Sequence, residues 1–283
     1  MTASFSIAGF PCSGMDWLGR LVSLHPAITV ADPPDRLGPL GRAPGTTPPL
    51  EPAAPPATHG AAGGKPGATH LGRIVVAGTG TARAPEFQVL RDGRDVLVAW
   101  TIRQLRAEGL ALRRFLATPG EGSRMPELYR CFRADPAEVL EGRPGLLLAD
   151  YDWVRYGAHL WDEAVSAYFG TLGAIEDGRI EGPTPTMLRY EVARADPLAA
   201  LNAVAGELGL DPMSADALGA RAELIGAGEP DAALREEWAI GRWTRYFTPR
   251  ASRLFRLEAE QSLEHLTDEY GDEWEGECAP EPE

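Results

Sequence analysis

The stretch Phe5–Pro26, FSIAGFPCSGMDWLGRLVSLHP, has the pattern of a strand, a tight loop and the start of a helix. Polar and apolar residues alternate over 4–8, which predicts a strand, and the glycines and proline that follow are turn residues. Trp17, Leu21 and Leu24 recur at helical spacing, which predicts a helix with one apolar stripe. Such a unit directs free backbone N–H groups and the positive end of a helix dipole at one point, where a phosphate can bind. The alternative is a first strand and helix without a ligand.

Length and charge favour one acidic domain. The chain has 283 residues, of which 44% are hydrophobic, and this suits one large α/β domain over residues 1–266. The formal net charge is −14, and residues 267–283 hold eight acidic residues and no basic one, which predicts a disordered acidic tail. Residues 31–68 hold ten prolines and seven glycines, which predicts a flexible insert. This composition argues against a nucleic-acid partner and against an anionic membrane surface.

The cysteines and the hydropathy pattern indicate the cellular compartment in which the chain is expected. Cys12, Cys131 and Cys278 show no paired spacing, so neither a disulfide framework nor a zinc site is indicated. No apolar run reaches 18 residues, and no charged segment followed by an apolar run opens the chain. We therefore expect a cytoplasmic protein that does not span a membrane.

The opening stretch also resembles the 5′-phosphosulfate loop of the sulfotransferases that use 3′-phosphoadenosine 5′-phosphosulfate (PAPS). That family has a strand, then Pro-Lys-Ser-Gly-Thr-Thr-Trp, then a helix ending near His-Pro. The shared residues are Pro11, Ser13, Gly14, Trp17, His25 and Pro26. Cys12 stands where the family has its phosphate-binding lysine, and Met15-Asp16 replaces two threonines. The Asp16 carboxylate would compete with an incoming phosphate for the same N–H groups.

A second match is VLRDGRDVLVAW, residues 89–100. The local pattern predicts a strand over 86–90 and a helix that begins near Gly93 and closes at Gly109. The family reads Arg-(Asn/Asp)-Pro-(Arg/Lys)-Asp-Val-x-Val-Ser here, and its first arginine and last serine hold the 3′-phosphate of the nucleotide. Arg91 matches the arginine, whereas Ala99 replaces the serine. Arg94-Asp95 is open to the simpler interpretation of a helix-start pair.

Further elements are expected along the chain. A buried strand is predicted over 73–78, and an amphipathic helix marked by Trp161, Val165, Tyr168 and Leu172. Residues 110–150 are weakly patterned apart from a buried leucine run at 146–148. The pair Asp196-Pro197 predicts a helix N-terminus.

The last matches lie toward the C-terminus. A strand predicted over 187–191 resembles the family's Tyr-Glu-Asp element, whose tyrosine lies against adenine, and this implies that role for Tyr190. Residues 241–248 resemble the family's Gly-Asp-Trp-Lys-Asn-x-Phe-Thr segment. Just upstream, Glu236 and Glu237 stand where the family has an Arg-Lys-Gly clamp for the 3′-phosphate. Two carboxylates in that place reverse the local field and weaken phosphate binding.

A general base is also implied by the resemblance. Ala68-Thr69-His70-Leu71 is similar to the family's Lys-Thr-His-Leu run, whose histidine takes the proton of the acceptor. The family histidine ends a strand, whereas His70 precedes the strand predicted from Arg73. His70 is therefore either the base or a loop histidine.

The resemblance implies an α/β three-layer fold with a central parallel sheet, of the sulfotransferase (P-loop nucleoside triphosphate hydrolase-like) type. Its nucleotide site would consist of Ser13, Gly14, Trp17, Arg91 and Tyr190. The implied activity is transfer of a sulfuryl group from PAPS to a hydroxyl or amine of a small molecule. Two alternatives stay open: a non-catalytic paralogue that acts as a partner, and an enzyme with another donor or reaction.

Overall fold

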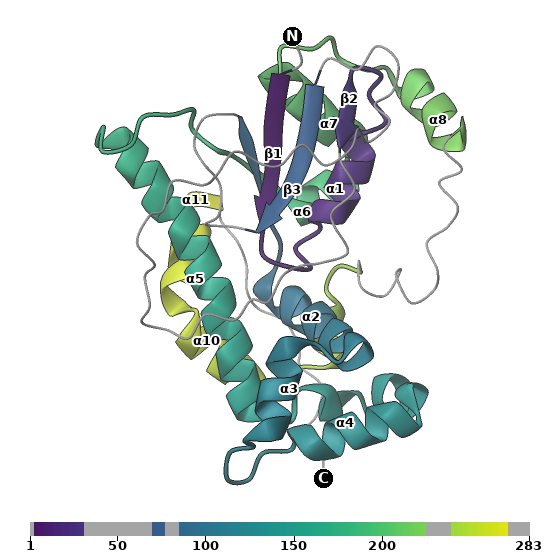
Figure 1. The fold of residues 1–283 in the computed structure, drawn as a ribbon, viewed down its shortest axis with the longest axis vertical. Coiled ribbons are helices and arrows are strands. Elements are labelled where there is room, and N and C mark those ends of the chain that lie inside the picture. The colour runs from purple at the N-terminus through teal and green to yellow at the C-terminus, as the bar shows by residue number, and fades with distance from the viewer. Residues whose placement is uncertain (1–2, 31–69, 77–84, 225–238, 271–283) are drawn as a thin grey trace.

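The computed structural model describes residues 3–30, 70–76, 85–224 and 239–270. The predictions for residues 31–68, for Glu236 and Glu237 and for most of the acidic tail lie outside these ranges. The described sheet has five parallel strands in the order β2-β3-β1-β4-β5 (Figure 1). They are β1 (Ala3–Gly9), β2 (Ile28–Val30), β3 (His70–Val76), β4 (Glu86–Leu90) and β5 (Thr186–Arg189). The predicted α/β class with a central parallel sheet is confirmed.

The middle of the sheet is the strand predicted from the opening stretch. Ile7 of β1 pairs with Ile74 of β3 on one side and with Phe87 of β4 on the other. The chain continues from β1 to β2 at one edge of the sheet and from β4 to β5 at the other edge. The carboxyl ends of β1 and β4 therefore form a topological switch point, which is where open α/β sheets bind ligands.

One face of the sheet is covered by α1 (Met15–Val22), α6 (Tyr190–Ala195) and α7 (Pro197–Glu207), with α8 (Ala215–Leu224) beyond them. Side chains of β1 and β4 that point to this face pack against Leu18 and Leu201. The predicted stripe of the first helix is partly wrong. Leu21 is buried, but Trp17 is only partly buried because α1 packs through Met15, Leu18 and Val22. Leu24 lies beyond the end of the helix and is also partly buried.

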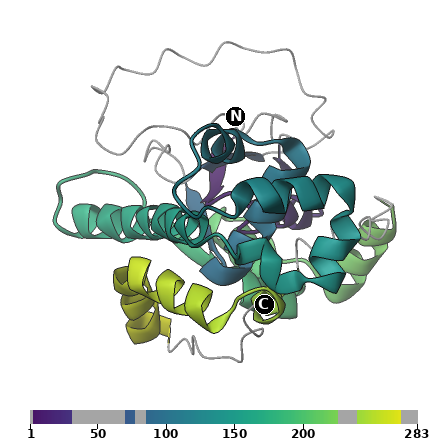
Figure 2. The same cartoon turned by 90° about the horizontal axis from the view of Figure 1, so that it is seen from below.

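The opposite face carries the larger core. Its helices are α2 (Gly93–Ala107), α5 (Tyr151–Glu176), α10 (Pro249–Glu258) and α11 (Glu260–Tyr270). In Figure 2 the yellow helices near the C-terminus lie alongside the long helix from the middle of the chain. The rings of Trp100 and Trp153 stack with 4.6 Å between their centroids. Of the residues that mark the predicted amphipathic helix, Trp161, Val165 and Tyr168 are buried, whereas Leu172 is partly buried. Helices on both sides of the sheet give the three expected layers.

Residues 110–150 contain more structure than their pattern predicts. They form α3 (Leu110–Ala117) and α4 (Met125–Ala134), a π-helical turn over Glu138–Gly142 and a 3₁₀ helix over Pro144–Leu148. Met125, Leu128 and Phe132 bury one stripe of α4. The helical spacing of these three residues is a sequence signal for a helix, although the charged residues around them make the pattern hard to recognise.

Helix ends follow local chemistry with two differences. The Asp196 carboxylate accepts the Ala199 N–H at 3.0 Å, so the predicted cap of α7 is confirmed. However, α2 ends at Ala107, and Glu108 rather than Gly109 takes the left-handed conformation, with φ of 50°. The last helix extends to Tyr270, so the first residues of the predicted disordered tail are helical. Within the described ranges, every helix is too short or too polar to cross a membrane.

Candidate functional site

The first loop, residues 10–14, joins β1 to α1 at the switch point. Two of its residues have left-handed backbone conformations, Cys12 with φ of 72° and Gly14 with φ of 103°. The Ser13 N–H donates to the Phe10 carbonyl at 3.0 Å, which closes the turn. Among the described side chains, none caps the N-terminus of α1. The first N–H groups of α1 are therefore available to an anion.

Ser13 of this loop has a buried hydroxyl that lies against the end of β1. The residue is 1% exposed, and its Oγ has no hydrogen-bond partner in the described part of the chain. A Cβ placed on Gly9 would lie 2.5 Å from this oxygen, so the hydroxyl sits directly over the end of β1. Leaving a buried hydroxyl unsatisfied costs about 1–3 kcal/mol. A ligand oxygen at the switch point would remove that cost.

The second loop, residues 91–92, follows β4 beside the first loop. Arg91 is 1% exposed, and its Nη1 donates to the Cys12 carbonyl at 3.0 Å. Its Nη2 donates to the Ala239 carbonyl at 2.8 Å. The guanidinium also lies over the ring of Tyr190, 4.8 Å from the centroid. Arg91 therefore connects the first loop to a segment 148 residues further along the chain.

That distant segment, residues 239–243, is here called the closing segment. The Asp95 carboxylate accepts the Gly241 N–H at 2.7 Å and the Trp243 N–H at 2.8 Å. Arg94 lies over the indole of Trp243, 3.6 Å from the ring centroid. Arg94 and Asp95 thus do more than start a helix, because together they hold the closing segment against α2.

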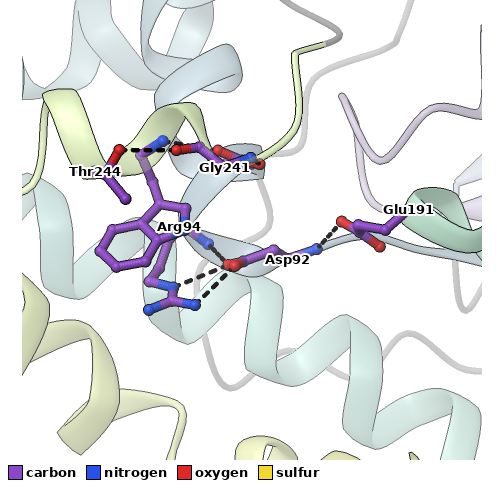
Figure 3. Close-up of polar contacts among 7 residues, drawn as sticks. Asp92, Arg94, Glu191, Gly241 and Thr244 are labelled. Atoms are coloured by element: carbon purple, nitrogen blue, oxygen red, sulfur yellow. Dashed lines mark hydrogen bonds and ion pairs between the residues drawn. The ribbon is translucent and has the colours of Figure 1, made fainter. Parts of the chain in front are cut away.

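Charged side chains form a hydrogen-bonded network at the start of α2 (Figure 3). Asp92 accepts the Arg94 N–H at 2.8 Å and forms an ion pair with its Nη2, also at 2.8 Å. The Asp92 N–H donates to Glu191 Oε1 at 2.9 Å. Burial raises the pKa of Glu191. Burial, helped by the negative charge of Asp92, raises the pKa of Asp95 to about 6.

Tyr190 closes the site from the side of α6. It is 1% exposed, and its ring lies so close to Gly14 that a side chain there would overlap it. The ring meets Trp17 edge to face, with 5.7 Å between centroids. Arg194 lies over the Trp17 ring at 5.3 Å. The buried ring of Tyr190 thus packs on the loop that the resemblance assigns to phosphate.

The structure brings most of the sequence-predicted site residues together, but not all of them. The residues predicted as a nucleotide site lie together around the switch point; they are Ser13, Gly14, Trp17, Arg91 and Tyr190.

His70 does not join them. Its backbone begins β3 and pairs with Ala3, whereas the first loop follows Gly9 at the other end of β1. Six residues of strand separate those ends, which is about 20 Å.

Sequence reasoning missed Asp95 and Glu191 as members of the site. A usable signal existed for Glu191, because it is the last residue of the strand predicted over 187–191, and parallel strands present their carboxyl ends to ligands. The structure ends β5 at Arg189 and begins α6 at Tyr190, so the last two residues of that predicted strand are helical. No comparable signal existed for Asp95, because the N–H groups that it accepts belong to a segment far along the chain.

No family model and no curated protein matches the chain significantly. Among solved structures, the chain is similar to mouse sulfotransferase SULT7A1, whose crystal structure is a complex with PAP. The identity is 15%, the likeness covers 94% of this chain and 89% of the mouse chain, and the TM-score is 0.48. This likeness concerns the course of the backbone, and any assignment of ligand and activity depends on the residues of the present chain.

Proposed function

We propose that this chain binds the phosphosulfate end of PAPS at the first loop and transfers the sulfuryl group to a hydroxyl or amine of a small molecule. The observation that carries the proposal is the buried hydroxyl of Ser13, which has no partner in the described structure and belongs to the loop that leads into the uncapped N-terminus of α1. Hydroxyl and N–H groups converging at a helix start are a good site for a phosphate. The acidity of the whole chain favours a small acceptor over a nucleic acid.

The chain would contribute binding and charge stabilisation. The donor supplies an activated sulfuryl group, whose bond to the phosphate breaks as the acceptor oxygen or nitrogen bonds to sulfur, and the proton of the acceptor passes to water. The N–H groups at the start of α1 and the Ser13 hydroxyl would stabilise the charge left on the phosphate. Arg91 stands on the other side of the switch point as the cation for the 3′-phosphate. His70 has no role in this proposal, because its backbone lies at the amino-terminal ends of the strands, away from the first loop.

Two replacements predict weak binding and slow turnover. Cys12 stands in the place of a phosphate-binding cation, and a charge-assisted hydrogen bond of that kind is worth about 1.5–3 kcal/mol. Asp16 adds a negative charge to the first turn of α1. A carboxylate there repels the phosphate that the helix dipole attracts.

A second candidate is a protein of the same fold that binds no PAPS and serves as a partner or uses another donor. Two contacts favour it. Both terminal nitrogens of Arg91 already donate to backbone carbonyls, and the ring of Tyr190 packs against Gly14. In this arrangement Arg91 and Tyr190 already have protein partners without a ligand.

Calorimetric titration with 3′-phosphoadenosine 5′-phosphate (PAP) separates the two candidates. We expect micromolar binding to the full chain and roughly tenfold weaker binding to Ser13→Ala, which loses one donor to phosphate. The matched control is Ser262→Ala on α11, whose buried hydroxyl donates to the Asp162 carbonyl at 3.3 Å and lies outside the site. Its affinity for PAP should equal that of the wild type. No heat at millimolar PAP would reject the first candidate in favour of the second.

A further inference from the structure

Two buried side chains hold the closing segment in place through its backbone. Arg91 donates to the Ala239 carbonyl, while Asp95 accepts from the Gly241 and Trp243 N–H groups. All three bonds are 2.7 to 2.8 Å long. Each bond has a charged side chain at one end, and hydrogen bonds of that type are the stronger ones.

The two ends of the closing segment differ in how they are anchored. Trp243 is 4% exposed and lies under Arg94, so this end is fixed by packing. Ile240 is 50% exposed, and Gly241 is also exposed. The Ala239–Gly241 end therefore depends on the polar bonds from Arg91 and Asp95 rather than on apolar burial. It is the part that can move without disturbing the core.

Arg91 is 1% exposed, so an anion can reach its guanidinium only where a group packed against it moves away. One terminal nitrogen, Nη1, holds the Cys12 carbonyl of the first loop, and breaking that bond would disturb the loop itself. An anionic oxygen makes a stronger bond to a guanidinium than a neutral carbonyl does. An anionic oxygen that takes the place of the Ala239 carbonyl at Nη2 is therefore favoured, and this carbonyl belongs to the exposed end of the closing segment.

We propose that Asp95 is a positioning residue that keeps the Ala239 carbonyl on Arg91. An anionic nucleotide reaches Arg91 by displacing this carbonyl, and nucleotide binding releases the Ala239–Gly241 end of the closing segment. The nucleotide part of the inference rests on the proposed function. The bonds by which Asp95 holds the closing segment, here called the tether, do not depend on it.

Amide hydrogen exchange, measured residue by residue, tests the release directly. Saturating PAP should raise the exchange rate of the Gly241 amide by about tenfold or more, because its bond to Asp95 opens. The Trp243 amide, next to the buried indole, is the internal reference and should change much less. Binding of PAP with no change at Gly241 would overturn the inference.

Carboxylate-to-amide variants separate the tether from simple charge. Asp95→Asn removes a negative charge and weakens the tether, and we expect PAP to bind about tenfold more tightly than to the wild type, since more molecules have Arg91 accessible. Glu191→Gln removes a charge beside the same loop but leaves the closing segment untouched. Its affinity should rise by less than about threefold. Equal gains in the two variants would assign the effect to charge alone and overturn the positioning role.

The tether can be judged even if PAP does not bind. In that case the proposed function fails, yet the Gly241 amide must still exchange faster in Asp95→Asn than in the wild type. Equal exchange rates in the two proteins would overturn the tether itself.

Discussion

The ring of Tyr190 lies directly over Gly14, at the point where the first loop enters α1. A Cβ on Gly14 would come within 2.5 Å of Tyr190 Cε2, well inside van der Waals contact. Gly14 also has φ of 103°, a conformation that other residues rarely adopt. Glycine is therefore required here for two independent reasons, the backbone conformation and the neighbouring ring.

Gly14→Ala is expected to destabilise the fold by about 2–5 kcal/mol, combining the left-handed backbone cost with overpacking against Tyr190. Urea unfolding measures the loss. Gly178→Ala is the matched control, because Gly178 has φ of 68° but nothing within 4 Å of its added methyl group. That variant should lose only about 1 kcal/mol. Similar losses at both positions would mean that the Tyr190 ring moves aside freely.

Asp95 should make stability depend on pH in a definite direction. Its pKa in the folded protein is raised from 3.8 to about 6, so the folded state holds this proton more tightly than the unfolded chain does. Below pH 4 both states are protonated, and between pH 4 and 6 the folded state keeps a proton that the unfolded state has lost. The contribution of Asp95 to the free energy of unfolding therefore falls as pH rises through this window, by up to ~3 kcal/mol.

The comparison with Asp95→Asn isolates this effect, since the amide does not titrate. We expect the stability of the wild type relative to the variant to be greater at pH 4 than at pH 7, measured by urea unfolding at each pH. The groups acting on Asp95 are the carboxylate of Asp92, the guanidinium of Arg91 and the N–H groups of the closing segment. Parallel curves for the two proteins would show that Asp95 does not titrate in this window.

Arg94→Lys should destabilise the protein even though the charge is kept. Arg94 forms an ion pair with Asp92 and at the same time lies 3.6 Å above the ring centroid of Trp243, and both contacts use the planar guanidinium. A lysine cannot make both, so we expect a loss of about 1–2 kcal/mol in thermal or urea unfolding. Arg250→Lys is the control, because Arg250 is an exposed arginine above Tyr151 at 4.2 Å. It should lose under about 0.5 kcal/mol, and equal losses would refute the special role of Arg94.

Local signals in the sequence were sufficient for several elements. The strands β1 and β4 and the helix start at Asp196 agree with their predictions, because alternation, turn residues and N-caps act over a few neighbouring residues. The weak points were elements with masked patterns, such as α4, and helix ends, such as Glu108 at the end of α2. There, charged flanks and a non-glycine left-handed residue conceal the signal.

The sequence by itself determined the strand, loop and helix start around Ser13 and the order of elements that makes a parallel sheet, since both follow from short-range patterning. Only the tertiary structure decided what surrounds that loop. Strand pairing put His70 at the amino-terminal ends of the strands, and packing set Tyr190 on Gly14. Arg91 and the Ala239 carbonyl met from positions 148 residues apart. Such contacts depend on which surfaces the folded chain brings together, and residue spacing along the sequence carries no record of them.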